Sequence, residues 1–258
     1  MEEFLKIEIE NRVAFISLNR PEKRNALNQK FILELITAFK KVEDNSGVKV
    51  VVLKALGETF SAGADLEYLQ QLQHNTYDEN LDDSTQLKYL FQTIYSLEKP
   101  VIAQIEGDAI AGGCGLATVC DIVFSTAKPK YGYTEVKIGF VPALVTAFLI
   151  RRIGGGRAKE MLLSGELIDA KTALQYGLVN FIIDDRKITA TVKNYALKLA
   201  NGTSAESLKA TKQLITAMDG LDLSESLDLA AKVNAQARLS GDCKRGIDAF
   251  LTKTHIDW

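Results

Sequence analysis

The sequence predicts an α/β fold in which a mainly parallel sheet is followed by a helical C-terminal region. Short β-branched segments alternate with segments of helical periodicity over the first two thirds of the chain. Parallel neighbours must be joined by crossover connections, so this alternation indicates parallel pairing. The chain contains no proline after Pro142, and from residue 188 onward only helical periodicities remain.

Composition excludes several classes of protein. Of the 258 residues, 47% are hydrophobic and 25% are charged, as in ordinary globular proteins, and the net charge is -2. That balance gives no general attraction to nucleic acid or to an anionic membrane surface. Neither an uninterrupted apolar stretch of membrane-spanning length nor a secretory signal pattern occurs. We therefore expect a cytoplasmic protein with no nucleic-acid or membrane partner.

The cysteines predict neither a disulfide framework nor a metal site. There are three, Cys114, Cys120 and Cys243. Their number is odd, their spacing matches no metal-binding pattern, and a chain of this size needs no disulfides for stability. We expect reduced thiols in the hydrophobic core and no bound metal.

The first elements are a hairpin, a helix and a strand. Apolar residues alternate on both sides of a turn at Asn11–Arg12, which predicts an N-terminal β-hairpin. After a polar loop, apolar residues recur at helical spacing over residues 28–44. The β-branched segment 48–55 predicts a buried strand.

The same pattern repeats further along the chain. A helical segment over residues 87–97 is ended by Pro100. A glycine-rich turn and a short apolar helix then separate two predicted buried strands. The strands of this stretch are predicted at residues 101–105, 121–125 and 179–183.

The chain divides into an α/β core, residues 1–187, and a helical region, residues 188–258. Several apolar residues of the helical region, such as Leu208, Leu214 and Ile215, exceed what a monomer of this length is expected to cover. The region therefore packs on the core or on another subunit. Its helices are predicted at residues 188–201, 204–218, 223–240 and 242–252.

Two glycine-containing turns are candidates for a binding site. The motif FSAGADL (60–66) follows one predicted strand, and EGDAIAGGCGLA (106–117) follows another. At such turns the free N–H groups of a first helical turn can converge on one point and form an oxyanion hole. Taken singly, each turn is better explained by close packing of a helix on a strand. Neither turn has the Walker lysine or the complete G-x-G-x-x-G pattern.

The two turns in this order resemble the crotonase (enoyl-CoA hydratase/isomerase) superfamily. Further similarity extends over nearly the whole chain. It runs through NRPEKRNALN (19–28), KYGYTEVKIGFVP (130–142), RAKEMLLSGELIDAKTALQYGLVN (157–180) and FLTK (250–253).

The resemblance implies a fold, an assembly and a class of substrate. The fold is a crotonase-like spiral of ββα turns, with residues 188–258 as a helical trimerisation region. The assembly is a homotrimer or a hexamer formed as a dimer of trimers. The substrate is an acyl-CoA thioester, so coenzyme A belongs to the substrate and no separate cofactor is expected. The activity is that of a lyase or isomerase of fatty acid metabolism.

The resemblance also implies roles for individual residues. The two oxyanion N–H groups fall on Ala64 and Gly112. Asp65 has a second interpretation, a buried carboxylate that caps a helix. The residues matching positions that contact coenzyme A are Arg24, Ala26, Leu27, Ala62, Asp65 and Leu66, with Phe250 and Lys253 reaching the nucleotide end, often of a neighbouring subunit.

The carboxylates determine which reaction the resemblance favours. Hydratases of this family use two glutamates around the Cα–Cβ bond. One of these positions is Gly115 here, and the other is Glu135. The segment after Pro142, Ala143 to Val145, is apolar rather than glycine-rich. With Glu135 as a single acid/base, isomerisation of a double bond is favoured over hydration.

Two alternatives remain beside double-bond isomerisation or hydration of an enoyl-CoA. One is dehydration or C–C cleavage of a specialised, branched 3-hydroxyacyl-CoA, with Glu135 in an altered role. The other is a non-catalytic acyl-CoA-binding homologue that lost activity with the first glutamate. A Ser-His-Asp hydrolase is not supported, because His74 and His255 lie beside no plausible nucleophile.

Overall fold

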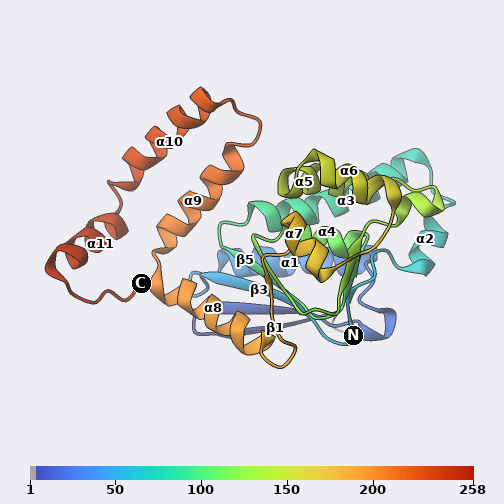
Figure 1. Ribbon diagram of the computed structural model, residues 1–258, viewed down its shortest axis with the longest axis horizontal. Helices are drawn as coiled ribbons and strands as arrows, with labels where there is room; N and C mark the ends of the chain where they lie inside the picture. Colours follow the sequence, from blue (N-terminus) through green and yellow to red (C-terminus); the bar gives the residue numbers. More distant parts are fainter. Residues whose placement is uncertain (1–3) are drawn as a thin grey trace.

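Two sheets and a set of surrounding helices form the protein, of which the computed structural model describes residues 4–258. The helices α10 and α11 extend from one end of the molecule, and α2 lies at the other end (Figure 1). The larger sheet contains, in spatial order, β1 (Leu5–Glu10), β2 (Val13–Leu18), β3 (Val50–Ala55), β5 (Val101–Ile105), β7 (Ile122–Ser125) and β10 (Phe181–Ile182). The smaller sheet contains β4 (Thr59–Ser61), β6 (Asp108–Ile110), β8 (Lys130–Gly132) and β9 (Ile168–Asp169).

The predicted parallel pairing is confirmed. In the larger sheet, β2, β3, β5, β7 and β10 are parallel, and only β1 is antiparallel to its neighbour. Each of β3, β5 and β7 is followed directly by a short strand of the smaller sheet. The chain therefore winds as a spiral of ββα turns, because each of these three strand pairs places one strand in each sheet before a helix follows.

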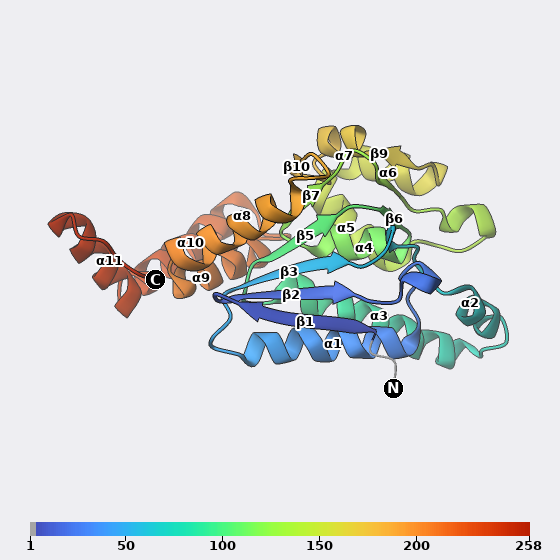
Figure 2. The same cartoon turned by 90° about the horizontal axis from the view of Figure 1, so that it is seen from below.

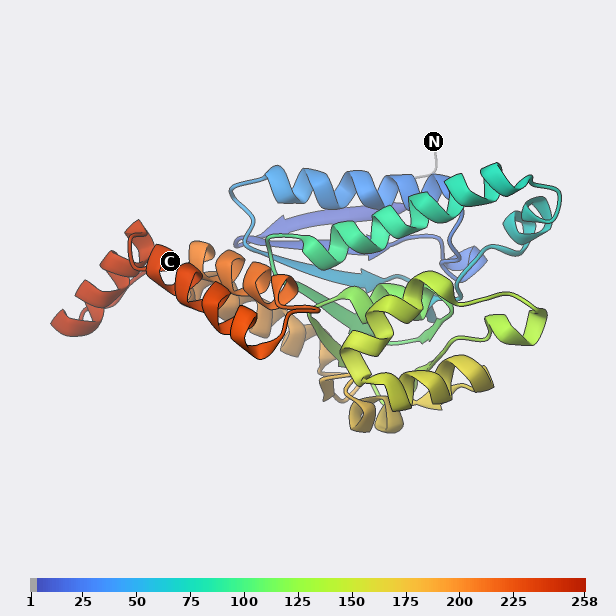
Figure 3. The same cartoon turned by 90° about the horizontal axis from the view of Figure 1, so that it is seen from above.

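Helices cover both faces of the larger sheet. Figures 2 and 3 show α1 and α3 side by side on one face, where both contribute to the main hydrophobic core. Four residues of α8 cover the other face. The bounds are α1 (Gln29–Asp44), α2 (Leu66–Leu72), α3 (Tyr77–Ser96), α4 (Gly112–Val119), α5 (Ala143–Ile153), α6 (Gly155–Ser164), α7 (Ala170–Tyr176), α8 (Ile188–Gly202), α9 (Ala205–Ala217), α10 (Leu223–Ala237) and α11 (Gly241–Thr252), with the 3-10 turns η1 (Pro21–Lys23) and η2 (Glu135–Ile138).

The central strands are apolar on both sides because both faces of the sheet are covered. On β2, Ala14 and Ile16 face the core beneath α1, whereas Val13 and Phe15 face α8. Successive side chains of a strand point to opposite faces, so each central strand needs a continuous apolar run. The continuous apolar runs are the reason that the central strands could be predicted from the sequence.

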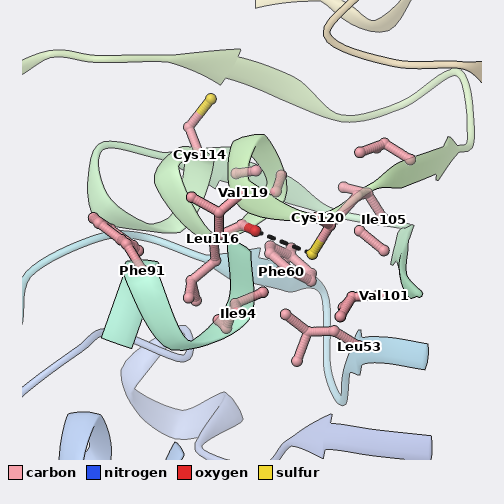
Figure 4. Close-up of a cluster of buried hydrophobic side chains, with 14 of the residues drawn as sticks. Leu53, Phe60, Phe91, Ile94, Val101, Ile105, Cys114, Leu116, Val119 and Cys120 are labelled. Atoms are coloured by element: carbon pink, nitrogen blue, oxygen red, sulfur yellow. Dashed lines mark hydrogen bonds between the residues drawn. The ribbon is translucent and has the colours of Figure 1, made fainter. Parts of the chain in front are cut away.

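The helix α4 is buried in the middle of the core. Figure 4 shows Leu116 and Val119 of α4 in one cluster with Phe91 and Ile94 of α3. Cys120 follows α4, and its thiol lies 3.2 Å from the carbonyl oxygen of Leu116. Burial raises the pKa of both Cys114 and Cys120 to about 12. Both are therefore neutral thiols of the core.

The helical region is attached to the core through α8 and α9. Lys212 of α9 is buried and lies 2.7 Å from the carboxylate of Asp121, whose oxygen also accepts a hydrogen bond from the N–H of Val101. Beyond α9, the helices α10 and α11 carry exposed apolar side chains. Within residues 4–258, no helix has the length and apolar composition required to cross a bilayer.

The loop between β2 and α1 is held by buried polar contacts. The guanidinium of Arg20 lies 2.5 Å from the carboxylate of Asp65 and 3.0 Å from the carbonyl oxygen of Ala26. Asn25 is fully buried, and its amide donates to the carbonyl oxygens of Leu56 and Thr59. These contacts fix the loop against the first glycine turn, which contains Asp65.

We expect Arg20→Met to lower the free energy of unfolding by about 3–5 kcal/mol, because it leaves the buried carboxylate of Asp65 without its charge partner. Urea denaturation followed by circular dichroism measures this. The matched control is Lys23→Met, which removes an exposed ion pair with Glu67 in the same loop and should barely move the transition. Equal effects of the two changes would show that the buried pair does not hold the loop.

Candidate active site

The two glycine turns predicted from the sequence are in contact. Gly63, in the turn between β4 and α2, has a φ of +86°. A Cβ at this position would lie 2.8 Å from the Cβ of Ala111, in the turn after β6, and 3.4 Å from the backbone nitrogen of Gly112, the first residue of α4. The close approach of the turns therefore depends on glycine at this position.

The backbone of Leu27 directs the first turn. Its N–H donates to the carbonyl oxygen of Gly63 (2.6 Å), and its carbonyl oxygen accepts from the N–H of Asp65 (2.9 Å). These bonds form a parallel bridge between Leu27 and Ala64. Because Leu27 bonds to the residues on either side of Ala64, the N–H of Ala64 itself points away from Leu27. Across residues 4–258, the N–H of Ala64 donates no backbone hydrogen bond.

The second free N–H belongs to Gly112, the first residue of α4. The N–H groups of a first helical turn have no acceptor within their helix, and that of Gly112 donates to no backbone oxygen of the described chain. Ala111 precedes it with φ +51° and ψ -123°, a conformation that non-glycine residues rarely adopt. A 2.8 Å hydrogen bond from the N–H of Ala111 to the carbonyl oxygen of Gly132 holds this strained residue.

Both N–H groups belong to residues that line one cavity of about 320 Å³. Its walls are mainly apolar, and two carboxylates lie among them, those of Glu135 and Asp83. None of the described lining residues carries a basic side chain. The lining comprises Leu27, Ile32, Ala62, Ala64, Leu66, Tyr68, Leu69, Leu72, Asp83, Ser84, Leu87, Ala111, Gly112, Thr134, Glu135, Ile138, Phe140, Val141, Pro142, Ala143, Leu144 and Val145.

Glu135 is placed at this cavity by the smaller sheet. It begins the 3-10 turn η2, three residues after β8. Its Oε2 is buried and has no hydrogen-bond partner in the described chain. Burial raises the pKa of Glu135, because an ionised carboxylate is poorly stabilised away from water. Such a carboxylate exchanges protons more readily near neutral pH than an exposed one.

The position of Gly115 cannot hold a second glutamate without rearrangement. A Cβ there would lie 2.7 Å from the ring of Phe91 and 2.7 Å from the side chain of Val145. Both neighbours are buried. The space that a glutamate would occupy is therefore filled by the apolar side chains of α3 and α5.

Several residues that the resemblance assigned to coenzyme A lie together. Leu27, Ala62 and Leu66 line the cavity, and the N–H of Ala62 donates to the carbonyl oxygen of Arg24 (3.0 Å). Arg24 is exposed beside this edge, while Ala26 is buried and accepts a hydrogen bond from Arg20. This loop and the first turn therefore form one continuous surface.

Asp65 has the structural role that its second interpretation described. Its carboxylate accepts from the N–H of Glu67 at the start of α2 and pairs with Arg20, and only 4% of the residue is exposed. A ligand has little access to it.

Phe250 and Lys253 are not brought to the cavity within one chain. Phe250 lies in α11 and is 83% exposed, and Lys253 follows directly at the C-cap. The cavity is lined in part by residues of α2. Figure 1 shows α11 at the opposite end of the molecule from α2. Any contribution of these two residues to a site must therefore be made to another subunit.

Sequence reasoning missed Asp83. It lies in the N-terminal half of α3, a segment not predicted as helix, within a run of acidic residues that reads as a solvated surface. The structure instead places it in the cavity lining, where its Oδ1 is buried and has no partner in the described chain. No local sequence signal distinguishes it from its neighbour Asp82, which is exposed.

The comparison with protein families decides the assignment. The sequence profile described as enoyl-CoA hydratase/isomerase matches residues 8–258. The chain belongs to the enoyl-CoA hydratase/isomerase family. It is an acyl-CoA enzyme of lyase or isomerase type, as the resemblance predicted.

Relatives match along almost their whole length. An enoyl-CoA hydratase homologue from Thermus thermophilus is 43% identical over 93% of this chain and 95% of its own. The short-chain-enoyl-CoA hydratase of Clostridium acetobutylicum is 32% identical over 97% of this chain and 95% of its own. The 2,3-dehydroadipyl-CoA hydratase of Escherichia coli is 31% identical, with 96% of each chain covered.

Solved structures confirm the crotonase fold. The enoyl-CoA hydratase of Mycobacterium smegmatis superimposes with a TM-score of 0.93 at 26% identity, covering 100% of this chain and 99% of that one. An enoyl-CoA hydratase of Shewanella pealeana gives a TM-score of 0.93 at 29% identity, covering 99% of this chain and 96% of that one. The family fold expected from the motifs is therefore present over the full length.

Proposed function

We propose that this enzyme moves the double bond of an enoyl-CoA thioester by way of an enolate. The observation that carries the proposal is the composition of one cavity. Two backbone N–H groups without backbone acceptors, those of Ala64 and Gly112, line it together with a buried carboxylate oxygen of Glu135 that has no partner. These are the parts that proton transfer next to a thioester carbonyl requires.

In the proposed reaction, the thioester oxygen accepts hydrogen bonds from Ala64 and Gly112. The ionised Glu135 removes a proton from Cα of a 3-enoyl thioester, and the electron pair of the broken C–H bond moves toward the carbonyl. Negative charge then develops on the oxygen, where the two N–H groups stabilise it. Glu135 returns the proton to Cγ as the electron pair moves back. The product is the 2-enoyl thioester, and Glu135 is ionised again.

Hydration is a second candidate, favoured by the relatives. The proteins of Clostridium acetobutylicum and Escherichia coli are named as hydratases of enoyl-CoA substrates. Adding water requires a group that takes a proton from water at Cβ while another delivers a proton to Cα. Because the position of Gly115 is closed by Phe91 and Val145, such a group must come from elsewhere.

The proposal includes coenzyme A binding along the edge formed by Arg24, Ala62 and Leu66. Arg24 supplies an exposed cation at this edge, and Leu66 presents a largely exposed apolar surface for the pantetheine chain. The phosphate groups of coenzyme A are anions, which a guanidinium binds well. In a trimer or a dimer of trimers, Phe250 and Lys253 would extend this site of a neighbouring subunit.

The oxyanion role of Ala64 is tested by proline. Ala64→Pro removes the N–H but no functional side chain, so we expect activity on an enoyl-CoA to fall by at least about 10²-fold. Ala64→Gly keeps the N–H and serves as the matched control, expected to retain most of the activity. Initial rates followed at saturating substrate measure both. Full activity of the proline variant would rule out this donor.

The proton-transfer role of Glu135 is tested by Glu135→Gln. We expect isomerisation of a 3-enoyl-CoA to fall by about 10²–10⁴-fold, because the amide cannot exchange a proton. In the unchanged enzyme, hydration of crotonyl-CoA should be well below isomerisation. The control Glu166→Gln changes an exposed glutamate paired with Lys137 and should leave both rates as they are. Retained isomerisation in Glu135→Gln would contradict the proposal.

The assembly is tested by multi-angle light scattering. The exposed apolar residues of α10 and α11, among them Leu223, Leu227 and Leu251, favour burial between subunits. At micromolar concentration we expect a mass of at least three chains of 28.4 kDa. A stable monomer would contradict it.

A further inference from the structure

Asp83 differs from the other acidic residues around it. Asp82 next to it is exposed, and Glu79 one turn earlier completes the capping box of α3 with Thr76. Asp83 instead lies on the side of α3 that contributes Leu87, one turn further on, to the cavity lining. The same helix face therefore carries both an apolar wall residue and a carboxylate into the cavity.

The carboxylate of Asp83 lacks the partners that a purely structural role requires. Its Oδ1 is buried and accepts no hydrogen bond from the described chain. Leaving such a group unsatisfied is unfavourable, and a structural carboxylate normally avoids this by capping a helix or by ion pairing. Asp65 in the same region shows such an arrangement, with Arg20 and a helix cap. Because Asp83 also lines the cavity, a molecule bound there is in position to supply the missing partner.

We propose that Asp83 is a second proton-transfer residue of this cavity and that it gives the enzyme a hydration activity. The inference rests on the proposed function, in which Ala64, Gly112 and Glu135 stabilise and protonate the enolate. Among the described residues lining the cavity, Asp83 is the acidic side chain other than Glu135. It supplies from α3 the kind of group that Gly115 cannot supply from α4.

Burial has the same effect on both carboxylates. It raises the pKa of Asp83 and that of Glu135, and no basic side chain of the described lining offsets this effect. Each of these carboxylates is therefore protonated nearer to neutral pH than an exposed one, and in the proposed hydration one acts as acid and the other as base.

Hydration of a 2-enoyl thioester requires two proton transfers in this proposal, one at each carboxylate. Ionised Asp83 takes a proton from water as the water oxygen bonds to Cβ of the 2-enoyl thioester. The electron pair of the double bond moves toward the thioester oxygen, which the N–H groups of Ala64 and Gly112 stabilise. Protonated Glu135 delivers its proton to Cα, giving the 3-hydroxyacyl thioester. Asp83 then holds a proton and Glu135 holds none, and exchange with solvent restores the starting state.

The experiment compares two reactions in matched variants. Asp83→Asn and Asp82→Asn make the same chemical change at adjacent positions, one in the cavity and the other exposed. Each is assayed for hydration of crotonyl-CoA and for isomerisation of a 3-enoyl-CoA. We expect Asp83→Asn to lower the ratio of the hydration kcat to the isomerisation kcat by about 10²–10⁴-fold. Asp82→Asn should leave this ratio unchanged.

A second variant guards against loss of fold. Asp83→Ala opens space in the cavity, and added formate should restore part of its hydration rate in a concentration-dependent way, as an external carboxylate replaces the missing one. Thermal unfolding of both Asp83 variants reports whether they remain folded. Restored hydration at an unchanged melting temperature supports proton transfer over a purely structural role.

The outcomes separate this inference from the proposed function. An unchanged ratio in Asp83→Asn, a rise in KM alone, or an absence of crotonyl-CoA hydration in the unchanged enzyme would overturn the role of Asp83 and leave isomerisation by Glu135 standing. A rise in KM alone would assign Asp83 to binding of the acyl chain instead. Isomerisation that survives Glu135→Gln would overturn the proposed function itself, and the inference with it.

Discussion

The contact between the two strand-to-helix turns is the constraint on which the active site depends. Three glycines allow the chain around β4 to approach the chain around β6, because a Cβ at each of them would meet atoms of the other segment. A Cβ at Gly63 would lie 2.8 Å from Ala111, one at Gly113 would lie 2.3 Å from the carbonyl oxygen of Ser61, and one at Gly107 would lie 1.9 Å from that of Glu58. The neighbouring strands β4 and β6 set this spacing. Without it, two N–H groups from separate turns could not line one cavity.

The charged residues around the site have two different roles: some stabilise the fold, and others are free to interact with a substrate. Arg20 and Asp65 form a buried ion pair, which holds the loop that carries Arg24 and Leu27 without a contact to Glu135 or Asp83. Glu135 and Asp83 are left without such partners and face an apolar cavity. Low polarity raises their pKa values and strengthens hydrogen bonds to a developing oxyanion. The stability of the extensive core offsets the cost of these unpaired groups.

The two ends of the molecule obey different packing requirements. Around the sheets, helices cover both faces, so that the strands β2 and β5 are buried throughout. At α10 and α11 the chain leaves this core, and leucines such as Leu223 and Leu227 remain exposed. The helix α8 belongs physically to the first environment, since Val192 and Ala196 complete the cover of the larger sheet. The change from helices with a buried apolar face to largely exposed helices therefore lies after α8.

The sequence by itself determined the elements whose pattern is local. The strand Val101–Ile105 was readable because both of its faces are buried, and helix α1 because one face is apolar and Asn28 caps it. Similarity of motifs pointed to Ala64, Gly112 and Glu135, and the structure places all three at one cavity. The strands of the smaller sheet are too short, two or three residues each, to show any periodicity.

Only the tertiary structure decided the environment of each candidate residue. It closed the position of Gly115 with Phe91 and Val145, and it separated Asp83 from the exposed Asp82 beside it. Burial of a carboxylate depends on walls built from segments far away in the chain. A short stretch of sequence cannot specify those walls, because they form only when α2, α3 and α5 meet around the same space.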